Sequence, residues 1–280
     1  MKKKIFYKII FISIFSFIMS FGNIKGTKVE AAPDTPALGQ ICLMAMNFVP
    51  RGWAKCDGTL LAISNNNALF ALLGTTYGGN GVATFALPNL KSPIPNAQYC
   101  IATQGIFPSV GSGTGFDPIL GQVELFPYNF TPSGWAKCEG QYLNITSNQA
   151  LFAILGTKFG GNGTSNFRLP DLRGTEPNSN MHYCIAIRGL YPSDDAYSNN
   201  ESLIGSINLY APSNQCKADM GLCDGGVLNI NSNTAAFGTV GTYYGGNGTI
   251  IFGKPDLRGA VPNPQLSYYL QLQGTYPVHQ

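Results

Sequence analysis

Short apolar runs alternate with clusters of Gly, Asn, Ser, Thr and Pro along most of the chain. Over residues 39–109 this pattern predicts strands at 40–43, 53–56, 85–87 and 99–102, and one helix over 66–73. Asp57-Gly58 forms a turn pair after the second strand, and Gly74 can take the positive φ that ends a helix. Pro88 biases Leu87 toward an extended backbone. The stretch therefore predicts an α+β unit with one short helix, a few short antiparallel strands and long loops.

The same pattern occurs three times, over residues 39–109, 121–193 and 205–277. The copies share four phrases in one order. GWAKCDG, GWAKCEG and MGLCDG come first, and GTTYGGNG, GTKFGGNG and GTYYGGNG follow. LPNLK, LPDLRG and KPDLRG are next, and YCIATQGIFP, YCIAIRGLYP and YYLQLQGTYP close the units. The intervals 110–120 and 194–204 are rich in Gly, Ser and Asn and are predicted linkers.

This ordered set of phrases resembles the phage tail collar domain family over nearly all of the chain after its leader. The resemblance implies a small fold of a helix and strands, with a structural and binding role. Collar domains associate as trimers, so three copies in one chain lead us to expect a pseudo-threefold disc. In the family, receptor binding and a metal site belong to a long insertion before the last strand. Here that interval is only residues 92–98, so we expect neither feature, and no cofactor.

The first 31 residues have the pattern of a secretory signal peptide. A Lys-rich start precedes an apolar stretch over 9–21, and Val29-Glu30-Ala31 offers small residues at a cleavage site. We therefore expect a bacterial protein that is secreted or lies at the cell surface. Removal of the leader takes six lysines and one glutamate and leaves a net charge of −2. That balance argues against nucleic acid binding, and no later segment is apolar enough to cross a membrane.

A unit of about seventy residues has a marginal core, so disulfides are expected to stabilise it. Cys56 and Cys100 stand at the positions that Cys138 and Cys184 hold in the second copy, which predicts the bonds Cys56–Cys100 and Cys138–Cys184. The third copy has Tyr269 at the second position and gains a cysteine nearby, which predicts Cys216–Cys223. Cys42 is left over. It competes for Cys100 or pairs between chains.

Several residues have both a structural and a functional interpretation. Trp53 and Trp135 are suited to stacking on sugars, but a core anchor is the better interpretation because Met220 replaces them in the third copy. The Gly-Gly-Asn-Gly loops lack the lysine of a phosphate loop and are predicted turns. Arg173 and Arg258 follow Asp171 and Asp256 in predicted turn pairs, and Lys91 stands at the same position in the first copy. Alternatively, Lys91, Arg173 and Arg258 form an anion or ligand site.

No constellation of the kind that catalysis needs recurs in the copies. His182 is replaced by Gln98 and Ser267, and His279 lies at the C-terminus, so neither a catalytic site nor a metal site is expected. We predict a secreted, non-enzymatic module for binding or adhesion that recognises a surface polymer such as a glycan, or a protein partner. The alternative is a structural subunit of an extracellular appendage or sheath, in which Cys42 crosslinks chains. A hydrolytic enzyme is a distant third.

Overall fold

A computed structural model describes residues 35–108, 118–191, 202–211 and 219–278, which belong to one compact unit over Pro33–Gln280. The predicted signal peptide, Cys216 and His279 lie outside these residues. In the part that is described, no helix combines the length and apolar character needed to cross a membrane.

The first repeat contains β1 (Ile41–Met44), β2 (Trp53–Lys55), β3 (Leu60–Ala62), the 3-10 turn η2 (Ile63–Asn65), α2 (Asn67–Leu73), β4 (Thr84–Ala86) and β5 (Gln98–Ala102). The second contains β6 (Gln122–Phe126), β7 (Trp135–Lys137), β8 (Tyr142–Asn144), α3 (Gln149–Leu155), β9 (Asn166–Arg168) and β10 (His182–Ala186). The third contains β11 (Ser206–Tyr210), β12 (Met220–Leu222), β13 (Val227–Asn229), α4 (Thr234–Val240), β14 (Ile251–Gly253) and β15 (Ser267–Gln271).

The α+β expectation holds in outline, because each described repeat has one α-helix and several short antiparallel strands, although strands predominate. The predicted helix over 66–73 is α2, and the four predicted strands of the first repeat are β1, β2, β4 and β5 within a residue or so. The strand β3 was not predicted. It has only three residues, and exposed and half-buried side chains alternate along it, so its sequence has no clear pattern of apolar and polar positions.

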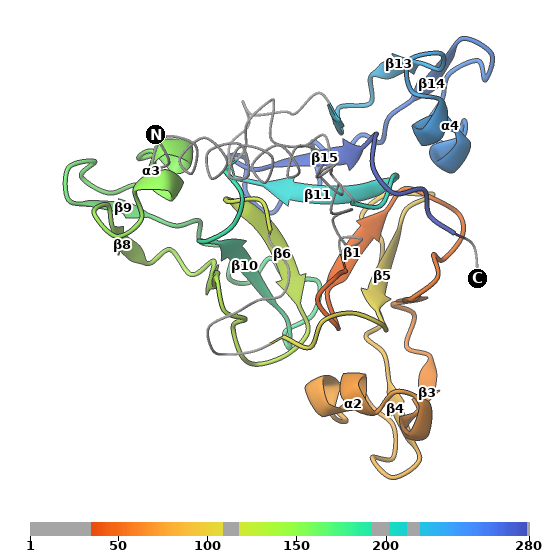
Figure 1. Cartoon of the computed structure of the whole chain (residues 1–280), viewed down its shortest axis with the longest axis horizontal. Coiled ribbons are helices and arrows are strands. Elements are labelled where there is room, and N and C mark those ends of the chain that lie inside the picture. The colour runs from red at the N-terminus through yellow and green to blue at the C-terminus, as the bar shows by residue number, and fades with distance from the viewer. Residues whose placement is uncertain (1–34, 109–117, 192–201, 212–218, 279–280) are drawn as a thin grey trace, which may run out of the picture. The chain divides into compact units, whose positions relative to one another are not determined.

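A nine-stranded sheet joins the three repeats (Figure 1). Each repeat contributes three strands to it, with its last strand between its first two. The first strands of the repeats also pair with one another. Leu43 lies opposite Ile207, Ile41 opposite Leu125, and Leu209 opposite Val123. Each of β1, β6 and β11 thus pairs with both of the others at the same relative register.

Both faces of these central strands are buried; β1 is apolar throughout, whereas β6 and β11 also bury the polar side chains of Glu124 and Asn208. One face, which carries Ile41, Leu43 and their counterparts, enters a single core shared by all three repeats. The other face forms three separate clusters, around Trp53, Trp135 and Tyr269. The shared core is the larger and holds most of the buried apolar residues of the four clusters.

Outside the nine-stranded sheet, each repeat has a lobe, which we define as its two-stranded hairpin and helix (Figure 1). The lobes are β3–β4 with α2, β8–β9 with α3, and β13–β14 with α4. In the first lobe Leu69 and Leu73 point from the helix into the shared core, and the ring centroids of Phe70 and Phe85 lie 5.5 Å apart. The helix has only seven residues, so its stability depends on this packing rather than on propensity.

The Gly-Gly-Asn-Gly turn of each lobe has two structural reasons for its sequence. Gly79 has a φ of +94°, and a Cβ at this position would lie 2.4 Å from the Cα of Phe85, so only glycine fits. The side-chain oxygen of Asn80 accepts hydrogen bonds from the N–H groups of Val82, Ala83 and Thr84 at 2.8–3.0 Å. The amides that a phosphate would need are therefore already used within the turn.

Contacts between repeats follow one cyclic order. Ala37, just ahead of the first repeat, packs into the cluster around Trp135. Ile119, just ahead of the second, packs into the cluster around Tyr269, and Leu203, just ahead of the third, packs against the cluster around Trp53. The lobes continue this order. The Tyr77 hydroxyl donates to the carbonyls of Pro127 at 2.9 Å and of Asn180 at 3.3 Å, and the Tyr244 hydroxyl donates to the carbonyl of Asn96, the equivalent of Asn180, at 2.6 Å. The third repeat therefore contacts the first as the first contacts the second.

Candidate binding site

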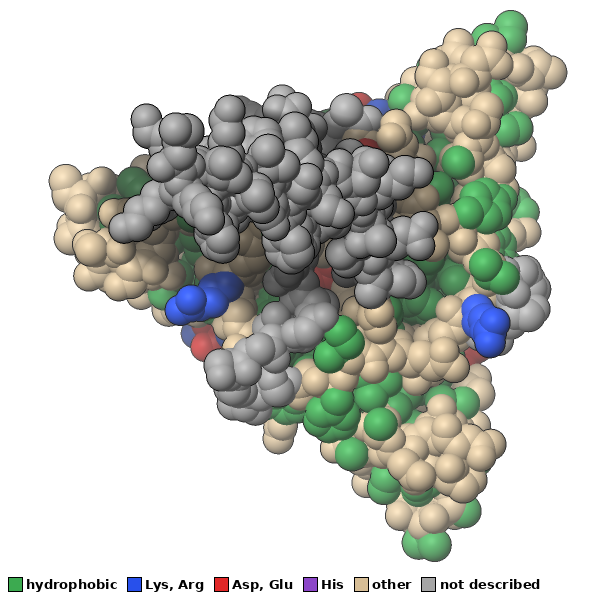
Figure 2. Space-filling model, viewed as in Figure 1, with side chains coloured by type: hydrophobic (Ala, Val, Ile, Leu, Met, Phe, Trp, Pro, Cys, Tyr) green, Lys and Arg blue, Asp and Glu red, His purple; other side chains and the backbone are tan. Residues whose placement is uncertain are grey.

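Two sets of equivalent apolar side chains remain exposed in all three repeats. The first is Leu60, Tyr142 and Val227, at the start of each lobe hairpin. The second is Phe107, Tyr191 and Tyr276, in the phrase Gly-x-aromatic-Pro that closes each repeat, with 51, 45 and 51% of their surface exposed. Figure 2 shows apolar side chains on the surface of the lobes of α2 and α4 and few charged ones on the same face. We call the second set the aromatic triplet.

Backbone pairing holds the aromatic triplet in place. The residue before each aromatic forms a parallel bridge with the residue two positions ahead of its own repeat: Ile106 with Ala37, Leu190 with Ile119, and Thr275 with Leu203. Ile106 is bound on both sides, since its N–H donates to the carbonyl of Pro36 at 2.9 Å and its carbonyl accepts from Leu38 at 2.8 Å. The aromatic side chains thus project from an ordered backbone. Sequence reasoning missed them, although an aromatic residue at this position in every copy was a visible signal.

The two tryptophans are not part of an exposed site. Trp53 and Trp135 are buried, at 7 and 5% exposure, and the Trp135 ring packs edge-on against Phe126 with centroids 5.2 Å apart. Their position in β2 and β7 next to the last strand of each repeat makes them core residues. Sugar stacking on them would require the core to open.

The arginines of the predicted anion site bind their own turns. The Arg173 guanidinium donates to both carboxylate oxygens of Asp171, at 2.8 and 2.6 Å, and Arg258 does the same with Asp256 at 2.9 and 2.6 Å. These hydrogen bonds lower the pKa of Asp171 and of Asp256 to about 2. Lys91 is exposed in the first repeat, where Asn89 replaces the aspartate. Ligand binding by Lys91, Arg173 and Arg258 stays a prediction.

The structure also brings together acidic residues that are distant in sequence. Bridges place Glu139 beside Asp171 and Asp224 beside Asp256. In the third repeat a buried lysine accompanies them, because Lys254 takes the position of the core residue Leu169 and its ammonium group lies 2.9 Å from the Asp224 carboxylate. Each of these aspartates forms an ion pair with a basic side chain, and this pairing argues against a role for the turns as a catalytic pair of carboxylates.

The disulfide predictions for the first two repeats need correction. Cys56, Cys100, Cys138 and Cys184 are free, buried thiols. Cys100 lies opposite Lys55, so the next residue, Cys56, points to the other face of the sheet and enters the shared core, whereas Cys100 packs near Trp53. Cys138 and Cys184 are separated in the same way, since Cys184 lies opposite Lys137. The bond Cys216–Cys223 stays a prediction because Cys216 lies outside the described residues.

Cys42 is buried in β1, directly opposite Cys100. This position argues against a bond between chains, because only 7% of the residue is exposed, but pairing between chains stays a prediction. The other alternative for Cys42, a bond to Cys100, agrees with the register of β1 and β5. Burial raises the pKa of the Cys42 thiol, and the nearby Glu124 carboxylate raises it further.

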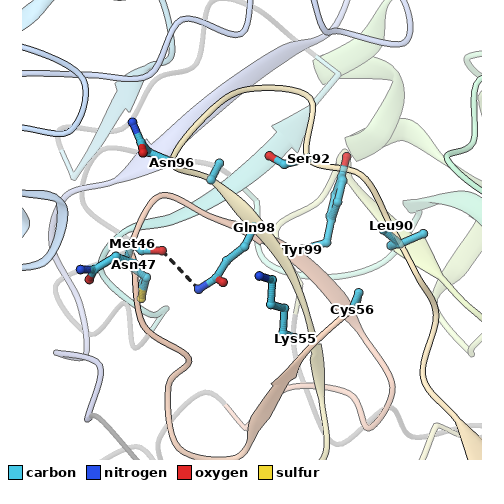
Figure 3. Close-up of a pocket in the computed structure, with 10 residues that line it drawn as sticks. Met46, Asn47, Lys55, Cys56, Leu90, Ser92, Asn96, Gln98 and Tyr99 are labelled. Carbon is cyan, nitrogen blue, oxygen red and sulfur yellow. Dashed lines mark hydrogen bonds between the residues drawn. The ribbon is translucent and has the colours of Figure 1, made fainter. Parts of the chain in front are cut away.

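The first repeat has a cavity at the place where the second repeat carries His182. A cavity of about 290 Å³ is lined by Lys55 of β2, Gln98 and Tyr99 of β5, and Asn96 (Figure 3). Ala97 also lines it, and the equivalent residues Met181 and Leu266 of the other repeats are larger and buried. His182 stands at the Gln98 position of the second repeat. Burial and the charge of Lys137 lower the pKa of its imidazole.

Comparison with known proteins identifies the repeats. The phage tail collar domain family matches residues 39–95, 121–177 and 205–262, which together make up more than half of the chain. No curated protein and no solved structure matched it. The family is a structural module of phage tail fibres. The expected resemblance and the copy number of three are both confirmed, and the chain belongs to the phage tail collar domain family.

Proposed function

We propose that this protein is a secreted, non-enzymatic module that binds an extracellular polymer, such as a glycan, or a protein partner through the aromatic triplet. The observation that carries the proposal is the exposure of Phe107, Tyr191 and Tyr276 at one position in all three repeats. Aromatic side chains offer a large apolar area at a small entropic cost, and they dominate many recognition surfaces. Secretion rests on the leader over 1–31.

We also propose that the three repeats form a pseudo-threefold disc, so that one chain takes the place of a trimer. Two features support it: the mutual pairing of β1, β6 and β11, and the cyclic packing of Ala37, Ile119 and Leu203. A rigid disc presents three equivalent sites to a repetitive polymer. Linked sites raise the apparent affinity by about 10²–10⁴ over that of one site when all can bind at once.

An array of bacterial polysaccharides and other glycans tests the binding proposal. The triple variant Phe107→Ser, Tyr191→Ser, Tyr276→Ser should lose the retention that the natural protein shows, because each substitution removes an aromatic contact. The matched control replaces the other exposed set, with Leu60→Ser, Tyr142→Ser and Val227→Ser, and should retain binding. Retention by the aromatic variant, or equal loss in both variants, would contradict the role of the triplet.

A structural subunit of an appendage is the second candidate, and the family supports it because collar domains are components of tail fibres. The burial of Cys42 argues against a crosslink between chains through this residue. Light scattering at rising protein concentration distinguishes the candidates. Ordered multimers that persist in a reducing buffer favour assembly, whereas a constant monomer mass favours a soluble binding module.

A further inference from the structure

The geometry points to a disulfide between Cys42 and Cys100, across β1 and β5 of the first repeat. The two residues are register partners in an antiparallel pair. Partners of this kind have Cα atoms about 4.5 or about 5.5 Å apart, and both separations lie within the range of about 4.4–6.8 Å that disulfides span. The backbone already has the spacing that the bond needs.

The side chains also share one environment. Cys42 and Cys100 belong to the same buried cluster, with Met44, Trp53 and Ala102. Residues directly opposite in a sheet point to the same face, so the two sulfurs approach each other by side-chain rotation alone. In the present arrangement the Cys42 thiol faces the carbonyl of Leu43 at 3.4 Å, which is a weak hydrogen bond that the disulfide would replace.

Comparison of the repeats shows that the pair is specific to the first one. The same register position holds Glu124 and Cys184 in the second repeat and Asn208 and Tyr269 in the third. Cys56, by contrast, stands at a position that is a buried cysteine in the shared core of every repeat. A cysteine there fills space as a small apolar side chain, whether or not its repeat has a cysteine in its last strand.

Bond formation proceeds by thiol–disulfide exchange with a disulfide oxidant, such as oxidised glutathione or a thiol oxidase. One cysteine thiolate attacks the oxidant and releases one of its sulfurs as a thiol. The second cysteine then attacks the mixed disulfide and releases the other. The two cysteines lose two protons and two electrons, and the oxidant is reduced to two thiols. An exported chain meets oxidants of this class outside the cytoplasm.

The timing of this step follows from burial. Burial raises the pKa of Cys100 to about 12 and the pKa of Cys42 above its usual value, so the folded protein holds very little of either thiolate. The exchange therefore takes place while the chain folds. Once formed, the bond is shielded from reductants by the same packing, and it fastens β1 to β5.

Refolding of the full chain in reduced and oxidised glutathione, followed by tryptic mapping without reduction, tests the proposal. Trypsin cleaves after Arg51, Lys55 and Lys91, so Cys42, Cys56 and Cys100 fall on three separate peptides. We expect the peptide that ends at Arg51 to be joined to the peptide 92–137. The oxidised protein should melt roughly 10 °C above its reduced form, because the bond restricts a long loop in the unfolded chain.

Three variants make the result decisive. Cys42→Ser should abolish both the joined peptide and the rise in melting temperature, and Cys56→Ser should leave them intact. Glu124→Cys places a cysteine opposite Cys184 and should create the equivalent bond in the second repeat, which tests the register independently. A peptide joining Cys56 to Cys100 would overturn the proposal. The proposal would also be overturned if the Glu124→Cys variant formed its bond to Cys184 while Cys42 stayed reduced under the same conditions.

Discussion

Leu43 is the residue at which the dependence of the repeats on one another is most directly measured. It lies in β1 opposite Ile207 of the third repeat, is 3% exposed and belongs to the shared core. Leu43→Ala removes three carbon atoms, worth about 2.4 kcal/mol of transfer free energy at about 0.8 kcal/mol each, and leaves a cavity. We expect the free energy of unfolding to fall by about 3 kcal/mol, and the melting temperature by roughly 6–12 °C for a domain of this size.

Guanidinium unfolding followed by tryptophan fluorescence and by circular dichroism provides the assay. Both probes should show one transition that moves to lower denaturant with an unchanged slope, because the cavity weakens a core that all the repeats share. Leu60→Ala is the control, since Leu60 is exposed and its loss should change the stability by less than about 0.5 kcal/mol. A separate early transition, with the remainder of the signal unmoved, would refute the reasoning.

Two further predictions concern polar contacts. In the third repeat, a double-mutant cycle of Lys254→Met and Asp224→Asn should give a coupling of about 1 kcal/mol at pH 7, modest because a third of the Asp224 side chain is exposed. Lys254 lowers the pKa of the Asp224 carboxyl. The stabilisation by this pair is therefore present above the unfolded pKa of about 3.9 and is lost as pH falls through the lower folded pKa. A coupling that persists in urea unfolding at pH 2 would contradict this prediction. At the junction of the first two repeats, Tyr77→Phe removes the hydrogen bond to Pro127 and should cost about 1 kcal/mol in the same assay. Tyr142→Phe alters an exposed hydroxyl and should cost nothing measurable, and equal effects of the two substitutions would exclude the junction as the cause.

Much of each repeat could be predicted because its boundaries are set by local chemistry. The turn residues Asp57-Gly58, Gly74 and Pro88 delimit the helix and strands, and these signals act over only a few neighbouring residues. The copy number was visible for the same reason, since the phrases carry those turns. The pairing of β1 with β6 and β11 was not predicted in detail, because register between distant strands depends on how the repeats pack.

The cysteines show where this kind of inference stops. Equivalent positions in two copies suggested Cys56–Cys100, but a disulfide depends on which face of the sheet each side chain occupies. The register places Lys55 opposite Cys100, and a shift of one residue moves a side chain to the other face. Phe107 is a similar case. The sequence shows an aromatic residue at this position in each repeat. The exposure of the Phe107 side chain, however, follows from the bridge at Ile106, which directs the next residue outward.

Hydrogen exchange of the central strands tests the central claim, that the three repeats fold as one body through β1, β6 and β11. The measurement compares the natural chain with Leu209→Ala, a substitution in the core-facing side of β11 opposite Val123. The account predicts that amides of β1 and β6 lose the same opening free energy as those of β11, because the three strands open together. Loss of protection confined to the third repeat, with β1 and β6 exchanging as before, would contradict it.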